Sequence, residues 1–369
     1  MIADKIRTGA YARAIRQTVK PGSVVLDVGT GTGILALIAC QAGARRVYAI
    51  EPDNIINVAK RLARTNGYAD QIKFIQDVST KVTLPEKVDV IVSDIRGILP
   101  MLGQSLVSIA DARQRLLAPG GALIPSYDQL WGTAVEAPDL YRNISDPWDN
   151  NGYDLDMRAA RRLVTNAWRK GRVSPEQFLS EPQCWGTLDY STLESPHVRA
   201  ELTWNVTRTG TAHGLSLWFD SCLAEGISFS NAPTEFELIY GSAFFPLTAP
   251  ILVATGDTVS VSLAANLVGA DYVWGWNTLV LSQGMIKADF KQSTFFANIL
   301  HPEQLRKISA THVPSLNDDG EVDRFILNLM DARNSLKEIA LRLSERFPDR
   351  FAGSQDALTK VSELSLKYS

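Results

Sequence analysis

The sequence has the composition of an ordinary globular protein. Its 369 residues are 45% hydrophobic and 21% charged, which is enough chain for two or three hydrophobic cores. The formal net charge of −3 gives no bulk reason to expect nucleic acid as a partner. The charged start MIADKIRTGAYARAI is unlike a signal peptide, and no apolar run approaches the ~20 residues of a membrane span. We therefore expect no membrane association.

The cysteine and histidine residues predict neither a disulfide framework nor a metal site. The three cysteines, Cys40, Cys184 and Cys222, form no CxxC pair, so a reducing cytoplasmic location fits best. The four histidines show no ligand spacing and lie in no cluster of metal-binding residues.

In the first third of the chain, short apolar runs alternate with helical patterns. The expected helices cover Ile34–Ala42, Asn54–Thr65 and about Leu99–Leu117. The expected buried strands are VVLDVG, RVYAIE, IKFIQD, VDVIVSD and GALIPS. This alternation predicts a parallel sheet covered on both faces.

After Pro125 the sequence becomes rich in β-branched and aromatic residues. The runs ELTWNVT, LSLWFDSCL, FELIYGSAFF and TVSVSLAANL predict an antiparallel β domain. A polar, arginine-rich helical segment at Met157–Lys170 interrupts it and predicts an exposed arm.

From about Pro302 the pattern is helical again. Ser335 followed by Glu338 predicts a capping box at the start of one helix. Apolar residues at helical spacing predict three helices: Val322, Phe325, Ile326 and Leu329; Leu336, Ile339, Ala340 and Leu343; Ala357, Val361, Leu364 and Tyr368.

A glycine loop follows the first strand, in VLDVGTGTGILAL. Its Gly29, Gly31 and Gly33 permit a tight turn and the close approach of a ligand to the backbone. Asp27 precedes the loop, and Glu51 ends the next strand, where an acid accepts hydrogen bonds from a ribose diol. Both NAD and S-adenosylmethionine need such an acid, and a purely structural turn is the remaining alternative.

The form DVGTGTG resembles motif I of class I methyltransferases, which favours S-adenosylmethionine as the cofactor. In that family the segment after the third strand contacts the adenine, and here it carries Asp77 and Val78. The entry segment MIADKIRTGAYARAI is similar to that of protein arginine methyltransferases. That resemblance implies that Arg7 pairs with the cofactor carboxylate and that Met1 adjoins the cofactor.

The same resemblance extends from Met1 to about Leu281, through FSNAPTEFELIYGSAFFPL and GDTVSVSL. It implies a Rossmann-like methyltransferase domain over 1–126, followed by an antiparallel β-barrel domain over 127–300. The segment WDNNGYDLDMRAARRLVTN resembles the family's dimerisation arm, which implies an arm at about 148–180 and a homodimer.

The acceptor half departs from the family pattern of two glutamates in a catalytic hairpin. In SDIRGILPMLGQSL, Asp94 takes the first acidic position, Gly103 or Gln104 takes the second, and Arg96 adds a positive charge. The family's Thr-His-Trp loop aligns onto Leu238, Ile239 and Tyr240, where only the aromatic character remains. We therefore expect Asp94, Arg96 and Tyr240 to form an acceptor site that is not suited to arginine.

The C-terminal residues 301–369 lie outside this resemblance. The segment from Ser315 to Pro348 loosely resembles small PqqD-like winged-helix domains that capture peptides, and a helical lid or interface element is the alternative. Eight acidic and eight basic residues over 321–369 give no basic stripe for DNA.

Together these features predict an S-adenosylmethionine-dependent methyltransferase that acts on a side chain of a peptide or protein. Two alternatives stay open at the level of sequence. One is a methyltransferase for a small metabolite, and the other is a non-catalytic scaffold with the same fold.

Overall fold

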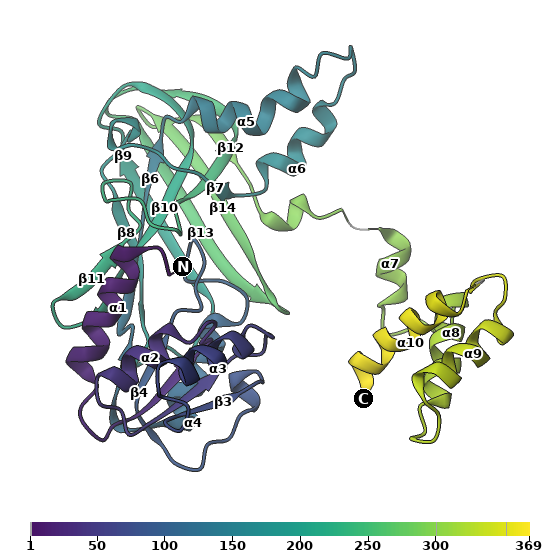
Figure 1. Ribbon diagram of the computed structural model, residues 1–369. Helices are drawn as coiled ribbons and strands as arrows, with labels where there is room; N and C mark the ends of the chain where they lie inside the picture. Colours follow the sequence, from purple (N-terminus) through teal and green to yellow (C-terminus); the bar gives the residue numbers. More distant parts are fainter. Residues whose placement is uncertain (1, 300, 352) are drawn as a thin grey trace. The chain divides into compact units, whose positions relative to one another are not determined.

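A computed structural model of the chain describes residues 2–299, 301–351 and 353–369 (Figure 1). The chain forms two compact units, of which the first ends at Asn298 and the second begins at Ile299. No helix in the described ranges is both long and apolar enough to cross a bilayer.

The first unit begins with a five-stranded parallel sheet in the order β3-β2-β1-β4-β5. Its strands are β1 (Val24–Val28), β2 (Arg46–Ile50), β3 (Ile72–Ile75), β4 (Val88–Ser93) and β5 (Leu117–Ile124). Every residue of β1 is buried, which explains why all of them except Asp27 are valine or leucine. The strand order reverses between β1 and β4. Ligands of open parallel sheets bind beyond the carboxyl ends of the strands at such a point.

Helices cover this sheet, but the one expected from about Leu99 begins only at Ser105. They are α1 (Lys5–Thr18), α2 (Ile34–Gln41), α3 (Ile56–Thr65) and α4 (Ser105–Leu116). The Asp4 side chain caps α1 by accepting from the Arg7 backbone N–H at 3.0 Å. In Figure 1, α1 runs between the two halves of the unit, and it contacts α2 as well as β10 and β11 of the antiparallel half.

The antiparallel half contains a six-stranded and a four-stranded sheet. Their strands are β6 (Tyr127–Val135), β7 (Arg169–Lys170), β8 (Gln183–Asp189), β9 (Val198–Asn205), β10 (Gly210–Ala224), β11 (Ile227–Ser230), β12 (Ala243–Val253), β13 (Thr258–Val268), β14 (Asp271–Ser282) and β15 (Met285–Phe290). Buried indoles of Trp204, Trp274 and Trp276 are among the largest side chains of its core. The predicted antiparallel β domain is confirmed.

A helical arm projects from this half, and its helices are α5 (Pro138–Asp149) and α6 (Arg161–Thr165) (Figure 1). The expected helix over Met157–Lys170 is wrong in extent. A short 3-10 turn at Arg158–Ala160 precedes α6, and Arg169 and Lys170 instead pair with β12. Further 3-10 turns lie at Ser79–Lys81, Pro175–Gln177 and Thr294–Ala297.

The expected strand FELIYGSAFF is also only half correct. Its first part forms no strand, and β12 begins at Ala243. The side-chain amide of Asn231 donates to the Gly241 carbonyl and so holds this segment as a loop. Within this loop, the side chains of Leu238 and Tyr240 are buried in the interior.

The second unit is helical throughout its described part. It contains α7 (Pro302–Lys307), α8 (Asp318–Leu329), α9 (Leu336–Arg346) and α10 (Ser354–Tyr368). Its small core includes Val322, Ile326, Ile339, Leu343 and Val361, as predicted from their spacing. The capping box of Ser335 and Glu338 is confirmed. A winged helix needs strands for its wing, and none occurs in the described part of 301–369. The PqqD-like resemblance stays a prediction.

Candidate active site

The glycine loop leaves β1 at the point where the strand order reverses. Gly29 has φ +71°, and an added Cβ there would meet the Ile95 side chain at 2.2 Å. Gly33 has φ +84°, and its Cβ would lie 2.9 Å from that of Ala59. Larger residues would therefore be strained at both positions, and glycine lets the backbone turn tightly into α2.

The carboxylate of Glu51 closes this loop from the end of β2. Its Oε2 accepts from the Gly31 N–H at 2.9 Å, and its Oε1 accepts from the Asp53 N–H at 3.1 Å. Each oxygen keeps a further lone pair for a ribose hydroxyl. The pocket beside it has a volume of about 240 Å³, and its lining includes Gly29, Ile50, Pro52 and Val78. A nucleoside fits this combination of an apolar slot and an acid.

Asp27 lies inside the loop and is 1% exposed. Its Oδ2 accepts from the Thr30 hydroxyl at 2.5 Å and from the Ala36 N–H at 3.1 Å. Its Oδ1 is buried and has no hydrogen-bond donor among the described residues. Burial raises the pKa of Asp27 to about 6, because the charged form loses its hydration. A cationic group of a bound cofactor is the kind of partner that Oδ1 lacks.

Asp94 follows β4 and is held by side chains from three segments of the chain. Its carboxylate forms an ion pair with Arg7 of α1, and both side chains are at most 4% exposed. It accepts from the Tyr240 hydroxyl at 2.6 and 2.7 Å and from the Tyr11 hydroxyl at 3.3 Å. Arg7 Nε also donates to the Tyr240 hydroxyl at 3.0 Å. We call Arg7, Tyr11, Asp94, Arg96 and Tyr240 the Asp94 cluster.

Arg96 links this cluster to a second buried acid. Its Nε lies 3.4 Å from Asp94 Oδ1, and its Nη1 donates to Asp128 Oδ1 at 2.8 Å and to the Ser221 hydroxyl at 2.9 Å. Asp128 also accepts from the Tyr190 hydroxyl at 2.6 Å. Burial alone would lower the pKa of Arg96, but Asp128 and other neighbours raise the pKa well above its usual value. Arg96 therefore stays charged and faces the interior.

Aromatic rings enclose the cluster. The Arg96 guanidinium lies 5.2 Å from the Phe219 ring and 5.8 Å from the Phe229 ring, which are cation–π distances. Phe229 also stacks on Tyr240 at 6.1 Å. Burial raises the pKa of Tyr240 above its usual range, and Asp94 raises it further, so its hydroxyl keeps its proton.

Comparisons with known proteins identify the family. The ribosomal protein L11 methyltransferase (PrmA) family matches residues 8–127, and the arginine methyltransferase oligomerization subdomain matches residues 129–270. A rice protein arginine N-methyltransferase, PRMT10 (Oryza sativa subsp. japonica), is 32% identical over 302 residues, which are 71% of this chain and 78% of the relative. The chain belongs to the protein arginine methyltransferase family.

Other members of the family agree with this assignment. An Arabidopsis thaliana probable protein arginine N-methyltransferase 6 is 36% identical over 229 residues, covering 60% of this chain and 52% of the relative. The chain thus spans about half the length of that relative. The Arabidopsis arginine methyltransferase 10 structure has a TM-score of 0.71 at 25% identity, covering 79% of this chain and 95% of that one.

A second solved structure shares the fold. It is the Trypanosoma brucei PRMT1 enzyme–prozyme heterotetrameric complex with AdoHcy, with a TM-score of 0.73 at 24% identity and 79% of this chain covered against 95% of that one. The expected fold, a Rossmann-like methyltransferase domain followed by a β-barrel domain, is confirmed. So is the expected class of enzyme, an S-adenosylmethionine-dependent methyltransferase.

Most residues that the sequence singles out converge on two places at the switch point. Asp27, Gly29, Gly31, Gly33 and Glu51 form the loop side. Val78 lines the neighbouring pocket, and the exposed Asp77 accepts from the Val78 N–H at 2.7 Å. Arg7, Asp94, Arg96 and Tyr240 form the buried cluster. Met1 lies outside the described residues.

The hairpin that carries two acids in this family carries one here. The Gln104 side chain donates to the Gly269 carbonyl at 2.6 Å, and Gly103 adopts φ +49°. Neither provides a carboxylate. Arg96 contacts both Asp94 and Asp128, which favours a role in holding Asp94 over direct contact with an acceptor.

Tyr11, Asp128, Tyr190 and Ser221 are polar members of the network that the sequence-based prediction does not name. Tyr11 stands in the entry segment itself, and its hydroxyl donates to the Ser93 carbonyl at 2.9 Å. Asp128 and Tyr190 come from the antiparallel half. Asp128 shares the buried face of β6 with Leu130, so an acid at a core-facing position of an alternating strand was the available signal.

Proposed function

We propose that this methyltransferase transfers the methyl group of S-adenosylmethionine to a neutral or anionic side chain of a peptide or protein, not to arginine. The proposal rests on one observation, which is that the carboxylate of Asp94 is already engaged by other side chains of the chain. Its carboxylate already has Arg7, Arg96, Tyr11 and Tyr240 as partners. An arginine substrate would have to compete with two of the chain's own guanidinium groups for one acid.

The charge balance of the site supports this choice. The buried arginines Arg7 and Arg96 are matched by Asp94 and Asp128, and the described part of the hairpin 93–106 offers no further carboxylate. A guanidinium entering here would bring an unmatched positive charge into a region of low exposure. Buried charges are costly unless they are paired. A neutral nucleophile, such as an imidazole or amide nitrogen, or a carboxylate, avoids this cost.

The residues present fit the cofactor. Glu51 would accept from the ribose hydroxyls, Val78 would contact the adenine, and Arg7 would bind the carboxylate. When bound, the cofactor supplies an electrophilic methyl group on a sulfonium. Its carboxylate would compete with Asp94 for Arg7, because both anions use the same guanidinium. Cofactor binding would thereby leave Asp94 with fewer partners and more able to contact an acceptor.

The chain's own residues then orient the acceptor. Asp94 and Tyr240 stand together, one as a hydrogen-bond acceptor and the other as a protonated donor. Methyl transfer is an in-line displacement, so rate depends on holding the nucleophile ~3–3.5 Å from the methyl carbon. Asp94 holds an N–H or O–H of the acceptor, or accepts the proton that the nucleophile loses.

A methylation assay on peptides that differ only in the acceptor side chain tests this proposal, with mass spectrometry as the readout. Methylation of a histidine, glutamine, asparagine or carboxylate peptide, and little on arginine, is the expected result. Asp94→Asn should lower turnover far more than cofactor affinity. Efficient arginine dimethylation that is lost in Asp94→Asn would overturn the proposal. Turnover of free metabolites alone, or of nothing, would favour a metabolite enzyme or a scaffold.

We also propose a homodimer joined through the arm, with each chain folding as a domain over 1–126, a β-barrel over 127–300 and a module over 301–369. The match of 129–270 to an oligomerization subdomain supports the dimer. A cytoplasmic location without nucleic-acid partners is part of the same proposal. A PqqD-like module at the C-terminus would recruit the peptide that the site modifies.

A further inference from the structure

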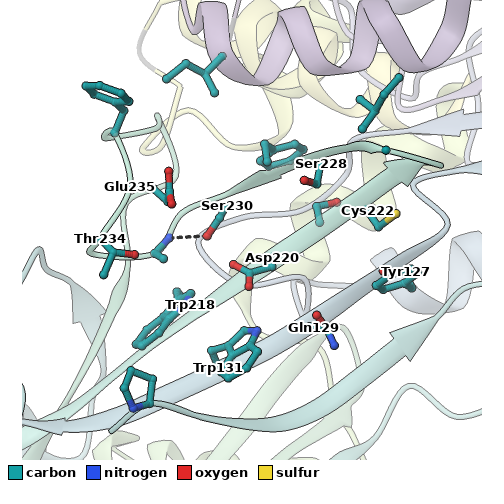
Figure 2. Close-up of a pocket in the computed structure, with 18 residues that line it drawn as sticks. Tyr127, Gln129, Trp131, Trp218, Asp220, Cys222, Ser228, Ser230, Thr234 and Glu235 are labelled. Carbon is teal, nitrogen blue, oxygen red and sulfur yellow. Dashed lines mark hydrogen bonds between the residues drawn. The ribbon is translucent and has the colours of Figure 1, made fainter. Parts of the chain in front are cut away.

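A pocket on the antiparallel half does not belong to the cofactor site. It has a volume of about 800 Å³ and lies on the antiparallel half, over β6, β10, β11 and the loop that follows (Figure 2). Paired residues of β6 and β10 form its floor. They are Trp131 opposite Trp218, Gln129 opposite Asp220 and Tyr127 opposite Cys222.

The lining of the pocket is acidic and aromatic. Asp220 and Glu235 are its two charged residues, and no lysine, arginine or histidine is among the residues that line it. Neither acid takes part in an ion pair within the described chain. Burial raises the pKa of Asp220, the Ser230 hydroxyl opposes this, and Glu235 raises the pKa further. The pocket therefore contains two carboxylates that lack a cationic partner.

Aromatic side chains flank these acids. Trp218 is buried and stacks on Phe178, whereas Phe236 is 80% exposed at the rim. The indole N–H of Trp131 is buried and has no acceptor among the described residues. Aromatic faces attract cations, and an unpaired buried donor favours a ligand that carries carbonyl oxygens. A peptide with a cationic side chain offers both groups.

The pocket and the Asp94 cluster share the same strands. Ser221 of β10 lines the pocket and its hydroxyl accepts from Arg96, and Phe229 of β11 lines the pocket and packs on Tyr240. Ile6, next to Arg7 on α1, is also part of the lining. The floor residues alternate along β6 and β10 with Asp128 and Ser221, so the pocket and the cluster lie on opposite faces of these two strands. A substrate would pass from one to the other at the edge marked by Ile6.

We propose that this pocket is a docking site for a lysine or arginine side chain of the protein substrate, separate from the residue that is methylated. The proposal rests on the peptide-modifying function above. The cation lies between the carboxylates of Asp220 and Glu235 and against the aromatic side chains, and the substrate continues past Ile6 towards Asp94. The enzyme thus selects a basic sequence context for an acceptor that is not itself basic.

Binding without turnover tests this. A fluorescein-labelled glycine–serine peptide with spaced lysines, and its matched glutamine version, are titrated against the full chain in excess S-adenosylhomocysteine, with anisotropy as the readout. The lysine peptide should bind about tenfold more tightly, a preference that high salt reduces. Asp220→Asn and Glu235→Gln should each remove most of that preference. Glu201→Gln, an exposed acid on β9, should not change it.

Several outcomes would overturn the docking site. One is equal affinity for the lysine and glutamine peptides. Another is a loss of the lysine preference in Glu201→Gln as large as in the pocket variants. A third is displacement of the labelled peptide by free lysine at a concentration equal to that of the peptide. Phe236→Ala is a second test variant that should fold normally, because this side chain is exposed. It should also weaken binding of the lysine peptide. Failure of the proposed acceptor class is seen separately, as arginine methylation in the peptide panel, and leaves these binding measurements unaffected.

Discussion

At the scale of single residues, Glu51 is the clearest test of the cofactor side. The Glu51→Gln variant keeps the shape of the side chain but removes its charge and one acceptor oxygen. We expect S-adenosylmethionine to bind more weakly by about 1–3 kcal/mol, because hydrogen bonds to an ionised acceptor are lost. Isothermal titration calorimetry measures this, with the exposed Asp70→Asn variant as the control. Unchanged affinity in Glu51→Gln would show that this acid does not hold the ribose.

Asp27 makes a prediction about pH. Its pKa in the folded chain is about 6, above the usual value of 3.8, so the folded state holds this proton more tightly than the unfolded state. Stability from this residue is therefore present at low pH and falls as pH rises from about 4 to 6. Asp27→Asn mimics the protonated form and keeps an acceptor for Thr30 and Ala36.

The measurement is urea unfolding of the cofactor-free protein at several pH values. Between pH 4 and pH 7, the free energy of unfolding of Asp27→Asn should rise relative to that of the original chain by up to about 3 kcal/mol. The gain should level off above pH 7, where Asp27 is ionised in both states. A difference that is constant across this range would contradict the shifted pKa.

The loop residues could be predicted from sequence because they are local, but the Asp94 cluster could only be predicted in part. Glycines, Asp27 and Glu51 lie within 25 positions of one another, and strand–loop–helix geometry fixes their meeting. Arg7 and Asp94 are 87 positions apart, and Tyr240 is 146 positions beyond Asp94. Resemblance to family motifs was enough to single out these three residues. Their contacts with one another depend on how the two halves of the unit pack, which the sequence does not show.

At the scale of elements, the arm is the part whose role is most open to test. Tyr153 is 77% exposed and Leu155 is 64% exposed between α5 and α6, although both side chains are apolar. A partner subunit would remove this surface from water. The double variant Tyr153→Asp and Leu155→Asp should therefore shift the protein from dimer to monomer. Light scattering at micromolar concentration measures the mass.

The control for the arm is Ile286→Asp, because this residue of β15 is similarly exposed at 68% and lies outside the arm. It should leave the mass unchanged. A monomer in the original chain, or a dimer that survives the double arm variant, would count against the arm as the interface.

Element boundaries were predicted well where burial is continuous and poorly where a loop carries apolar residues. The strands β1, β2 and β4 follow the predicted runs because their sequences are largely buried in the sheet, whereas the partly exposed β5 begins at Leu117, before the predicted run. The segment before Ala243 has a similar composition, yet its Leu238 and Tyr240 are buried as parts of a loop. Burial by a loop produces the same residue types as burial by a strand, so composition alone cannot separate them.

At the scale of the whole molecule, the two compact units predict separable functions. Residues 299–369 have a core of their own, so a chain that ends at Asn298 should fold. If the module recruits the substrate, this truncation should lower methylation of the full-length substrate and leave S-adenosylmethionine affinity within about twofold. Calorimetry and mass spectrometry measure the two quantities.

Other results of that truncation have distinct meanings. A lid or interface role predicts weaker cofactor binding or lower solubility. Identical activity with and without the module would contradict both the recruitment role and the lid role. The small core of the module, with helices and no strand in its described part, supports neither role by itself.

Asp94 holds the two halves of the first unit together at a single point. One carboxylate, at the end of β4, ties the entry helix by Arg7 and Tyr11 to the antiparallel half by Tyr240. Separating the two halves at this point breaks the contacts of Asp94 to both of them together, so a partial separation retains little of their stabilisation. Release of the product cofactor and admission of a new acceptor should then occur in one cooperative step. An anion that takes Arg7 from Asp94 would favour this separation.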